Sequence, residues 1–198
     1  LITSDKVFVT QKNVGKKNET SLSQQAINEA MSIISKKKKS ENFVDNYNDI
    51  DKVKFSPPML AKEYTSYNDK IKFCQPKLDG IRCNMNFSNG KILALSRKNH
   101  EFYSVDHIKD KMYEVLSKHP SIHVDGELYN HSLYDDFNKI VSLVKKEKIS
   151  EEDKSEIVKY VRYHIYDLWD DDNPDMTFKN RSRLIQELFS DIEYVDIV

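Results

Sequence analysis

The sequence predicts an α+β domain preceded by a short basic segment, and three observations lead to this prediction. Hydrophobic residues make up 38% of the 198 residues and charged residues 32%, which suits one packed core with a well-solvated surface. From residue 59 onward, strand-like runs alternate with stretches that repeat apolar residues every three or four positions. Ser88-Asn89-Gly90 separates two strand-like runs, which is typical of a hairpin. Together these features favour helices packed on a sheet.

The composition also limits the possible classes of protein. The formal net charge of −1 excludes a uniformly basic nucleic-acid binder of the histone type. No apolar run approaches the ~18 residues that a membrane span needs, and two cysteines are too few for a disulfide framework. Because the chain starts at Leu1 without a signal-peptide pattern, we expect a fragment of an intracellular protein rather than a secreted one.

The chain is expected to have three segments. These are a basic segment over residues 1–45, a linker over 46–58 that ends in Ser56-Pro57-Pro58, and a folded domain over 59–198. Residues 1–40 carry five more positive than negative charges. Such a segment either contacts phosphates or forms a solvated lysine-rich tail, and both interpretations stay open.

The basic segment carries the signals of one helix. Ser21-x-x-Gln24 matches a capping box, in which a side-chain oxygen accepts from a backbone N–H three residues on. Ile27, Ala30, Met31 and Ile34 then follow the spacing of an amphipathic helix.

In the domain, apolar periodicity predicts a series of alternating elements. In chain order these are strands at 71–77, 81–87 and 91–97, a helix at 106–118, a strand at 122–129, a helix marked by Leu133 to Val144, a short polar helix near 151–160, a strand at 161–169 and a helix marked by Leu184 to Phe189.

The segment Gln75-Pro76-Lys77-Leu78-Asp79-Gly80-Ile81-Arg82 carries the chemistry that the sequence predicts. A turn between two strands explains its Asp-Gly pair, but not the flanking cations. Gly80 permits a reversal that brings Arg82 back beside Lys77. A free lysine amine is protonated at neutral pH, but neighbouring cations and a bound metal release its lone pair for attack on phosphorus. Arg82 stays charged and offers a bidentate donor to ribose or phosphate oxygens.

With Lys77, Asp79, Gly80 and Arg82 in the pattern KxDGxR, the chain resembles the covalent nucleotidyltransferases, which comprise ATP-dependent polynucleotide ligases and mRNA capping guanylyltransferases. Pro58-Met59-Leu60-Ala61 before the lysine motif is more similar to DNA ligases, and residues 1–45 weakly resemble the tail of a WGR-like segment fused to ligases of phages and large viruses. Further matches follow in the family's order: Ser96-Arg97, Val124 to Tyr129, Tyr163 to Leu168 and Arg181-x-x-Leu184.

The resemblance implies a nucleotidyltransferase (ATP-grasp-like) adenylation domain with antiparallel sheets flanked by helices. The family's later motifs, a second acidic strand and a lysine-rich strand, do not follow Arg181, and neither does its small β-barrel domain. We therefore expect an adenylation domain that is incomplete at the C-terminus and that adenylates poorly by itself.

The resemblance also implies roles for matched residues that touch the nucleotide. Lys77 would be the catalytic nucleophile that takes AMP from ATP. Gln75 would bind the adenine edge, where an amide offers both donor and acceptor, or would be an ordinary strand-surface glutamine. Arg82 would contact the ribose side, and Tyr166 would stack on the adenine or would be a core aromatic.

The remaining matched residues concern the metal and the DNA. Glu127 would contact the ribose or a Mg²⁺ ion, a hard cation that prefers carboxylate oxygens. Arg97 would bind the 5′-phosphate at the nick, or would be an exposed arginine at a strand end. Asp125 is either part of the acidic motif or a turn residue, and Asp167 is expected to be structural.

Taken together, the resemblance implies an ATP-dependent DNA ligase that works with ATP and Mg²⁺ as a monomer on nicked double-stranded DNA, in repair, replication or recombination. Its place would be the cytoplasm of a microbial or virus-infected cell, away from membranes. RNA ligation or mRNA capping by the same lysine chemistry is an alternative, and so is a catalytically inactive DNA-binding module.

Overall fold

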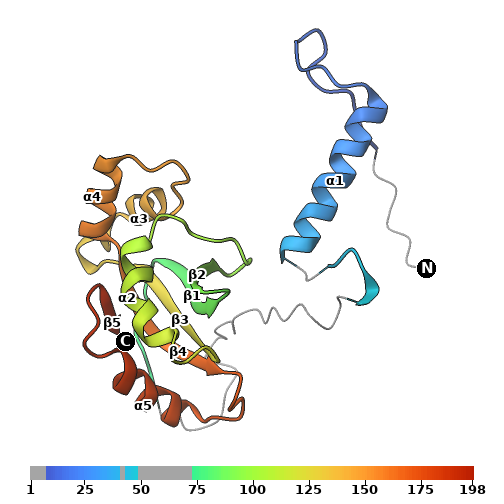
Figure 1. Ribbon diagram of the computed structural model, residues 1–198. Coiled ribbons are helices and arrows are strands. Elements are labelled where there is room, and N and C mark those ends of the chain that lie inside the picture. The colour runs from blue at the N-terminus through green and yellow to red at the C-terminus, as the bar shows by residue number, and fades with distance from the viewer. Residues whose placement is uncertain (1–7, 41–42, 49–72) are drawn as a thin grey trace. The chain divides into compact units, whose positions relative to one another are not determined.

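The computed structural model describes residues 8–40, 43–48 and 73–198. By their internal contacts the residues form two compact units, Leu1–Phe55 and Ser56–Val198, which are described separately here (Figure 1). Most of the predicted linker and the Pro58-Met59-Leu60-Ala61 match lie outside the described residues.

The first unit is built on helix α1, Leu22–Ser40. The backbone N–H of Gln24 donates to the Ser21 hydroxyl at 3.2 Å, so the helix begins at the predicted cap. The predicted helix is confirmed, and its apolar stripe is exposed. Ile27, Met31 and Ile34 are 53%, 64% and 52% exposed, because no described residue of this unit covers that face.

The second unit is a five-stranded sheet with strand order β2-β1-β3-β4-β5 (Figure 1). All neighbouring pairs are antiparallel except β4 and β5, which run parallel. The strands are β1 Ile81–Ser88, β2 Lys91–Ser96, β3 Ile122–Tyr129, β4 Arg162–Asp170 and β5 Val195–Ile197. The first four confirm predicted strands, and β5 is too short to have left a periodic signal.

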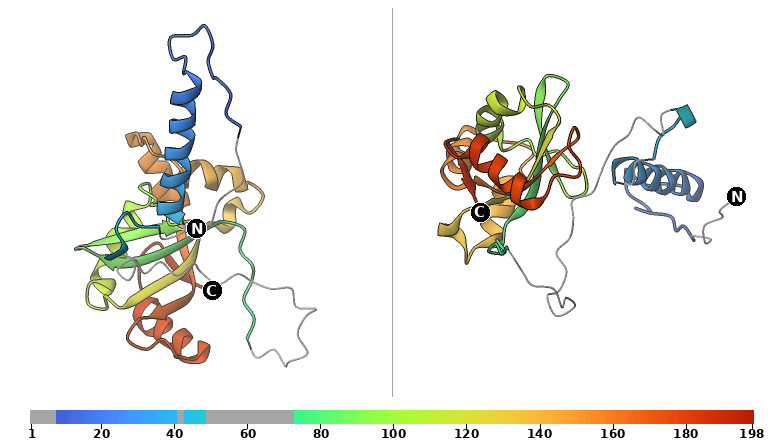
Figure 2. Two further views of the ribbon diagram at one scale, coloured as in Figure 1. Left: turned by 90° about the vertical axis from the view of Figure 1, so that its right-hand side faces the viewer. Right: turned by 90° about the horizontal axis from the view of Figure 1, so that it is seen from below.

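Helices pack on one face of this sheet (Figures 1 and 2). Buried side chains alternate along β1, β2 and β3, and they join buried side chains of the helices in a single core. The opposite sheet face is therefore free to carry polar residues. The helices are α2 Asp106–Leu116, the 3-10 turn η3 His131–Leu133, α3 Phe137–Val144, α4 Glu151–Tyr160 and α5 Phe178–Phe189.

The sequence predicted the turn between β1 and β2 correctly, but it predicted one strand that does not form. Asn89 and Gly90 both have positive φ, 50° and 78°, which is the two-residue turn predicted between β1 and β2. The predicted strand at 71–77 is wrong over its described part, since residues 73–77 belong to no strand of the described chain. An extended segment becomes a strand only when a neighbour pairs with its backbone, which its own sequence does not reveal.

No helix among the described residues is both long enough and apolar enough to cross a bilayer.

Candidate active site

The face of the sheet that lies opposite the helices collects charged and polar side chains. We call this surface the polar face and define it by six half-buried residues: Arg82, Asn84 and Asn86 on β1, Asp125 and Glu127 on β3, and Tyr166 on β4. Alternation along β1 and β3 places the first five there, because their neighbours in sequence pack towards the core. Three of the predicted nucleotide-binding residues, Arg82, Glu127 and Tyr166, thus lie on one surface.

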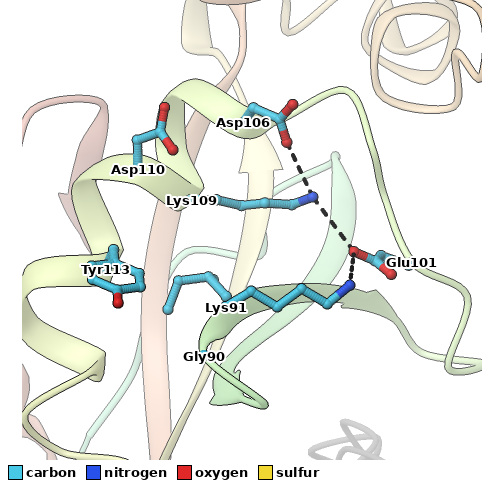
Figure 3. A pocket seen from close by; sticks show the side chains of 8 residues that line it. Gly90, Lys91, Glu101, Asp106, Lys109, Asp110 and Tyr113 are labelled. Atoms are coloured by element: carbon cyan, nitrogen blue, oxygen red, sulfur yellow. Dashed lines mark ion pairs between the residues drawn. The ribbon is translucent and has the colours of Figure 1, made fainter.

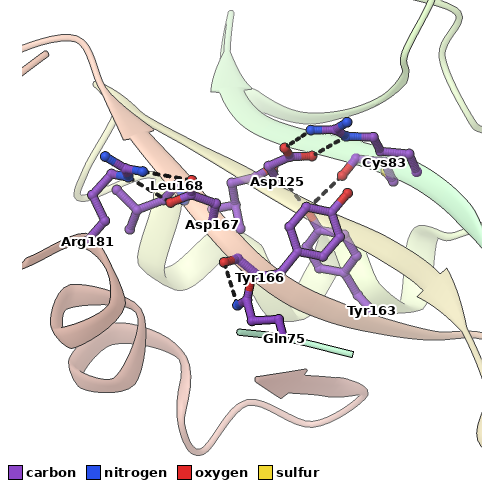
Figure 4. Close-up of polar contacts among 10 residues, drawn as sticks. Gln75, Cys83, Asp125, Tyr163, Tyr166, Asp167, Leu168 and Arg181 are labelled. Atoms are coloured by element: carbon purple, nitrogen blue, oxygen red, sulfur yellow. Dashed lines mark hydrogen bonds and ion pairs between the residues drawn. The ribbon is translucent and has the colours of Figure 1, made fainter. Parts of the chain in front are cut away.

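The strongest contact on the polar face joins Arg82 to Asp125. The Arg82 Nε donates to Asp125 Oδ1 at 3.0 Å, and its terminal nitrogen donates to the other carboxylate oxygen, so the pair is bidentate (Figure 4). Burial raises the pKa of the Asp125 carboxyl, and the two bonds from Arg82 oppose that rise. Asp125 is therefore not a turn residue, since it lies in the middle of β3.

A β-bulge brings Tyr166 into this group. The register between β3 and β4 shifts at Asp125/Gly126, so that Asp167 pairs with Asp125 and Ile165 with Gly126, leaving Tyr166 as the extra residue. The guanidinium carbon of Arg82 lies 5.7 Å from the centre of the Tyr166 ring. Burial and the adjacent Asp125 carboxylate raise the pKa of the Tyr166 hydroxyl, which therefore stays protonated as a hydrogen-bond donor to that carboxylate.

Glu127 on β3 lies next to Gly80, the residue that directly precedes β1. Burial raises the pKa of Glu127 from its ordinary value of 4.5 to about 7, although a hydrogen bond from the Gly80 backbone and the charges of Arg82 and Lys77 act in the opposite direction. A Cβ at Gly80 would lie 2.4 Å from the Leu128 carbonyl oxygen and 2.8 Å from Glu127 Cγ. Only glycine allows this close approach, which explains its place in the lysine motif.

The segment before β1 carries Lys77 and Gln75. Lys77 is exposed, and its charge is near enough to Glu127 to lower the pKa of that carboxyl. Gln75 is anchored near β4 and β5. Its side-chain nitrogen donates to the carbonyl oxygens of Tyr166 at 2.9 Å and Val198 at 3.3 Å (Figure 4). The anchor holds the segment near β4, and Lys77 lies outside the strands of the described chain.

Arg97 lies apart from the other predicted site residues. It directly follows β2, the edge strand, and its side chain is exposed. Because Ser96 pairs with Cys83, Arg97 lies at the end of the sheet where β1 begins, the end that also carries Arg82. The structure thus places Arg97 at the rim of the polar face.

Asp167 is structural, as predicted. Both of its carboxylate oxygens accept from Arg181 on α5, at 2.7 and 2.9 Å, and Arg181 also donates to the Met176 carbonyl (Figure 4). The bulge therefore serves two purposes: one of its residues faces the candidate site and the next fastens α5 to the sheet.

Asp125 is the residue of the polar face whose place the sequence left open. The signal that finds it is its position, two residues before Glu127 on a strand with a period of two, which puts both carboxylates on one face. A positive partner on the neighbouring strand is then required, because a half-buried carboxylate is costly without one.

A separate hollow of about 240 Å³ lies between the β1–β2 hairpin and α2 (Figure 3). Its cations are already matched, since Lys109 pairs with Asp106 and Glu101 at 3.2 and 3.7 Å, and Lys91 pairs with Glu101 at 3.6 Å. None of the predicted site residues lines it, and its lining consists of Gly90, Lys91, Ile92, Glu101, Asp106, Lys109, Asp110 and Tyr113.

Comparisons with known proteins give several related sequences. A DNA ligase of African swine fever virus, isolate Pig/Kenya/KEN-50/1950, is 27% identical over 192 residues, covering 92% of this chain and 42% of the viral protein. The DNA ligase of the isolate Tick/South Africa/Pretoriuskop Pr4/1996 is 26% identical with the same coverage. The chain thus spans about two fifths of the length of the curated relatives that it matches.

Solved structures with a similar chain path include a protein titled Pmar-Lig_Pre., with a TM-score of 0.48 and 20% identity over 61% of this chain and 28% of that one. Another is the ATP-dependent DNA ligase from bacteriophage T7 in complex with ATP, with a TM-score of 0.44 and 19% identity over 61% of this chain and 46% of the phage protein.

The family model described as the ATP dependent DNA ligase domain matches residues 58–197, which include the whole sheet and the polar face. Its span contains the lysine motif, the acidic strand with Asp125 and Glu127, and the bulged strand with Tyr166. This chain belongs to the family of ATP-dependent DNA ligase domains.

Proposed function

We propose that the protein containing this chain is an ATP-dependent DNA ligase in which Lys77 is the nucleophile. The observation that supports this most directly is the gathering of Arg82, Asp125, Glu127 and Tyr166 on one face of the sheet, with the charge of Lys77 acting on Glu127. The names of the viral relatives support ligation of DNA.

The proposed chemistry begins at the Lys77 amine. Once deprotonated, Nζ attacks the α-phosphorus of ATP; an N–P bond forms, the bond to the bridging oxygen breaks, and pyrophosphate leaves with its electron pair. The AMP then passes to the 5′-phosphate at a nick, and the adjacent 3′-hydroxyl displaces AMP to close the strand. Each step exchanges one bond to phosphorus for another, so no oxidant or reductant is needed.

The other residues bind and orient the nucleotide in this proposal. Arg82 is held by Asp125 as a fixed cation, and its positive charge attracts ribose or phosphate oxygens. Tyr166 presents a ring for the adenine, and Gln75 lies beside the Tyr166 carbonyl, within reach of an adenine edge. Arg97, at the rim, takes the 5′-phosphate of the nicked strand.

Magnesium fits this set of residues as a metal held mainly by the nucleotide. Within the described ranges no three or more His, Cys, Asp or Glu side chains form a metal-binding group, so the protein would contribute Glu127 and the triphosphate would supply other oxygens. The ion would offset the negative charge of the triphosphate. A cation beside Glu127 would also favour the ionised carboxylate, whose pKa burial raises.

The same proposal extends to the setting of the reaction. We assign residues 59–198 to the N-terminal part of the adenylation domain, 46–58 to a linker and 1–45 to a basic segment that resembles the tail of a WGR-like domain. The substrate is nicked double-stranded DNA, bound by a monomer inside the microbial or infected cell.

The test uses the protein expressed from its complete natural reading frame. Incubation with α-³²P-ATP and Mg²⁺ should leave an acid-labile label on the denatured protein, and nicked duplex should discharge the label as the strand is sealed. Lys77→Ala should abolish labelling and sealing, whereas Lys118→Ala, which removes an exposed lysine beyond α2, should retain both. Label retained by Lys77→Ala, or accepted only from α-³²P-GTP, would refute the proposal.

A further inference from the structure

The covered face of the sheet contains a tyrosine that joins three strands. Tyr163 on β4 is 0% exposed, and its hydroxyl lies 2.9 Å from both the Cys83 carbonyl on β1 and the Val124 carbonyl on β3. One hydroxyl proton is shared between two acceptors that belong to different strands. A buried hydroxyl needs a partner, and here that need draws two neighbouring strands to one point.

Strand β3, which lies between β4 and β1, has a glycine, Gly126, beside the Tyr163 ring. A Cβ on Gly126 would lie 2.7 Å from Tyr163 Cε2 and 2.6 Å from the His164 carbonyl oxygen. The ring therefore occupies the space that any other side chain on β3 would fill. This contact explains why a glycine separates the two acidic residues of the strand, Asp125 and Glu127.

Both carbonyl groups belong to residues next to the candidate site. Cys83 follows Arg82, and the Val124 carbonyl is part of the peptide bond that leads into Asp125. On the opposite surface these two neighbours form the bidentate pair. The hydroxyl thus fixes β1 against β3 directly beneath the pair that holds the Arg82 guanidinium.

We infer that Tyr163 is a positioning residue for nucleotide binding: from the core side its hydroxyl sets the separation of β1 and β3, and thereby the place of Arg82 and Asp125 on the polar face. This inference rests on the proposed function, in which Arg82 contacts the bound nucleotide. Tyr163 itself touches no substrate, so its effect reaches the nucleotide through the two strands.

Tyr163→Phe tests the inference, because it removes the hydroxyl and keeps the ring. In the protein from the complete reading frame, the KM for ATP in self-adenylation should rise about threefold to tenfold, the range that one neutral hydrogen bond supports, while kcat stays within about twofold. The Arg82 side-chain Nε–Hε signal in a ¹H–¹⁵N spectrum should move in the same variant. Tyr113→Phe is the matched control, since Tyr113 on α2 is 45% exposed. It should change neither the KM for ATP nor the Arg82 signal.

The split between KM and kcat separates positioning from mere support of the fold. A variant that only loses folded protein shows a lower apparent kcat at unchanged KM, and that result overturns the inference. An unchanged KM overturns it even if the Arg82 signal moves. If Lys77→Ala stays active, the proposed function fails whatever Tyr163 does; if Lys77 behaves as proposed and Tyr163→Phe leaves KM unaltered, only this inference fails.

Discussion

The partly buried Glu127 carboxylate should cost the protein stability at neutral pH, and Glu127→Gln should recover that cost. Burial raises the pKa of Glu127 from 4.5 to about 7. At about 1.4 kcal/mol per pKa unit the full rise corresponds to about 3.5 kcal/mol. Because the side chain is only half-buried and is screened by solvent, we expect a smaller gain, of about 1 to 2 kcal/mol, in the free energy of unfolding.

The sign and the pH window follow from proton binding. Between pH 4.5 and about 7 the folded protein keeps a proton on Glu127 that the unfolded chain has released, so the contribution of this group falls as the pH rises. Below the ordinary pKa both states are protonated and the group has no effect. The difference between Glu127→Gln and the unmodified chain should therefore be near zero at pH 4, grow through pH 6 and level off above about pH 7.5.

Urea unfolding followed by circular dichroism at pH 4, 5, 6, 7 and 8 measures this difference. Glu187→Gln, an exposed glutamate on α5, is the matched control and should give no trend. A stability difference that is flat with pH, or a variant that is less stable at pH 8, would refute the reasoning. Loss of ATP binding in the stabilised variant is expected as well, since functional groups are often held at the expense of stability.

Three further substitutions test individual contacts of the second unit by chemical or thermal unfolding. Gly80→Ala should destabilise by at least about 2 kcal/mol, because the methyl group would meet the Leu128 carbonyl oxygen at 2.4 Å; a loss under 0.5 kcal/mol would contradict the close approach. Arg181→Met should cost about 2 to 4 kcal/mol, because it leaves the Asp167 carboxylate without its bidentate partner, and the double change with Asp167→Asn should recover part of that loss. Ser150→Ala should cost about 1 kcal/mol by removing the reciprocal cap of α4, and an unaltered melting temperature would show that the cap is unimportant there.

The regular elements were predictable because their signals are local. The turn at Asn89 and Gly90 has residues that tolerate positive φ, and the apolar positions of α2 repeat at the helical period. The segment 73–77 has strand-like composition but no partner in the described chain. Pairing is a non-local property, so composition alone predicted one strand too many and missed the short parallel strand β5.

The sequence indicated which residues belong to the candidate site, but not which contacts they make with one another. Motif spacing pointed to Arg82, Glu127 and Tyr166, and these lie on the polar face. The partnership of Arg82 with Asp125 depends on the register between β1 and β3, and the place of Tyr166 depends on the bulge in β4. Registers and bulges are set by the packing of whole strands, which no short motif encodes.

The spacing of the acidic motif reflects the two different faces of the sheet. One face packs against the helices in the core, and the other carries the candidate site residues. A strand with a period of two gives Asp125 and Glu127 to the polar face and the residue between them to the core. On the core side the Tyr163 ring needs the space of a side chain, so that residue must be glycine. The glycine of Asp-Gly-Glu is thus fixed by packing while its neighbours are fixed by charge, and a substitution at position 126 should damage the site without touching any group that faces a nucleotide.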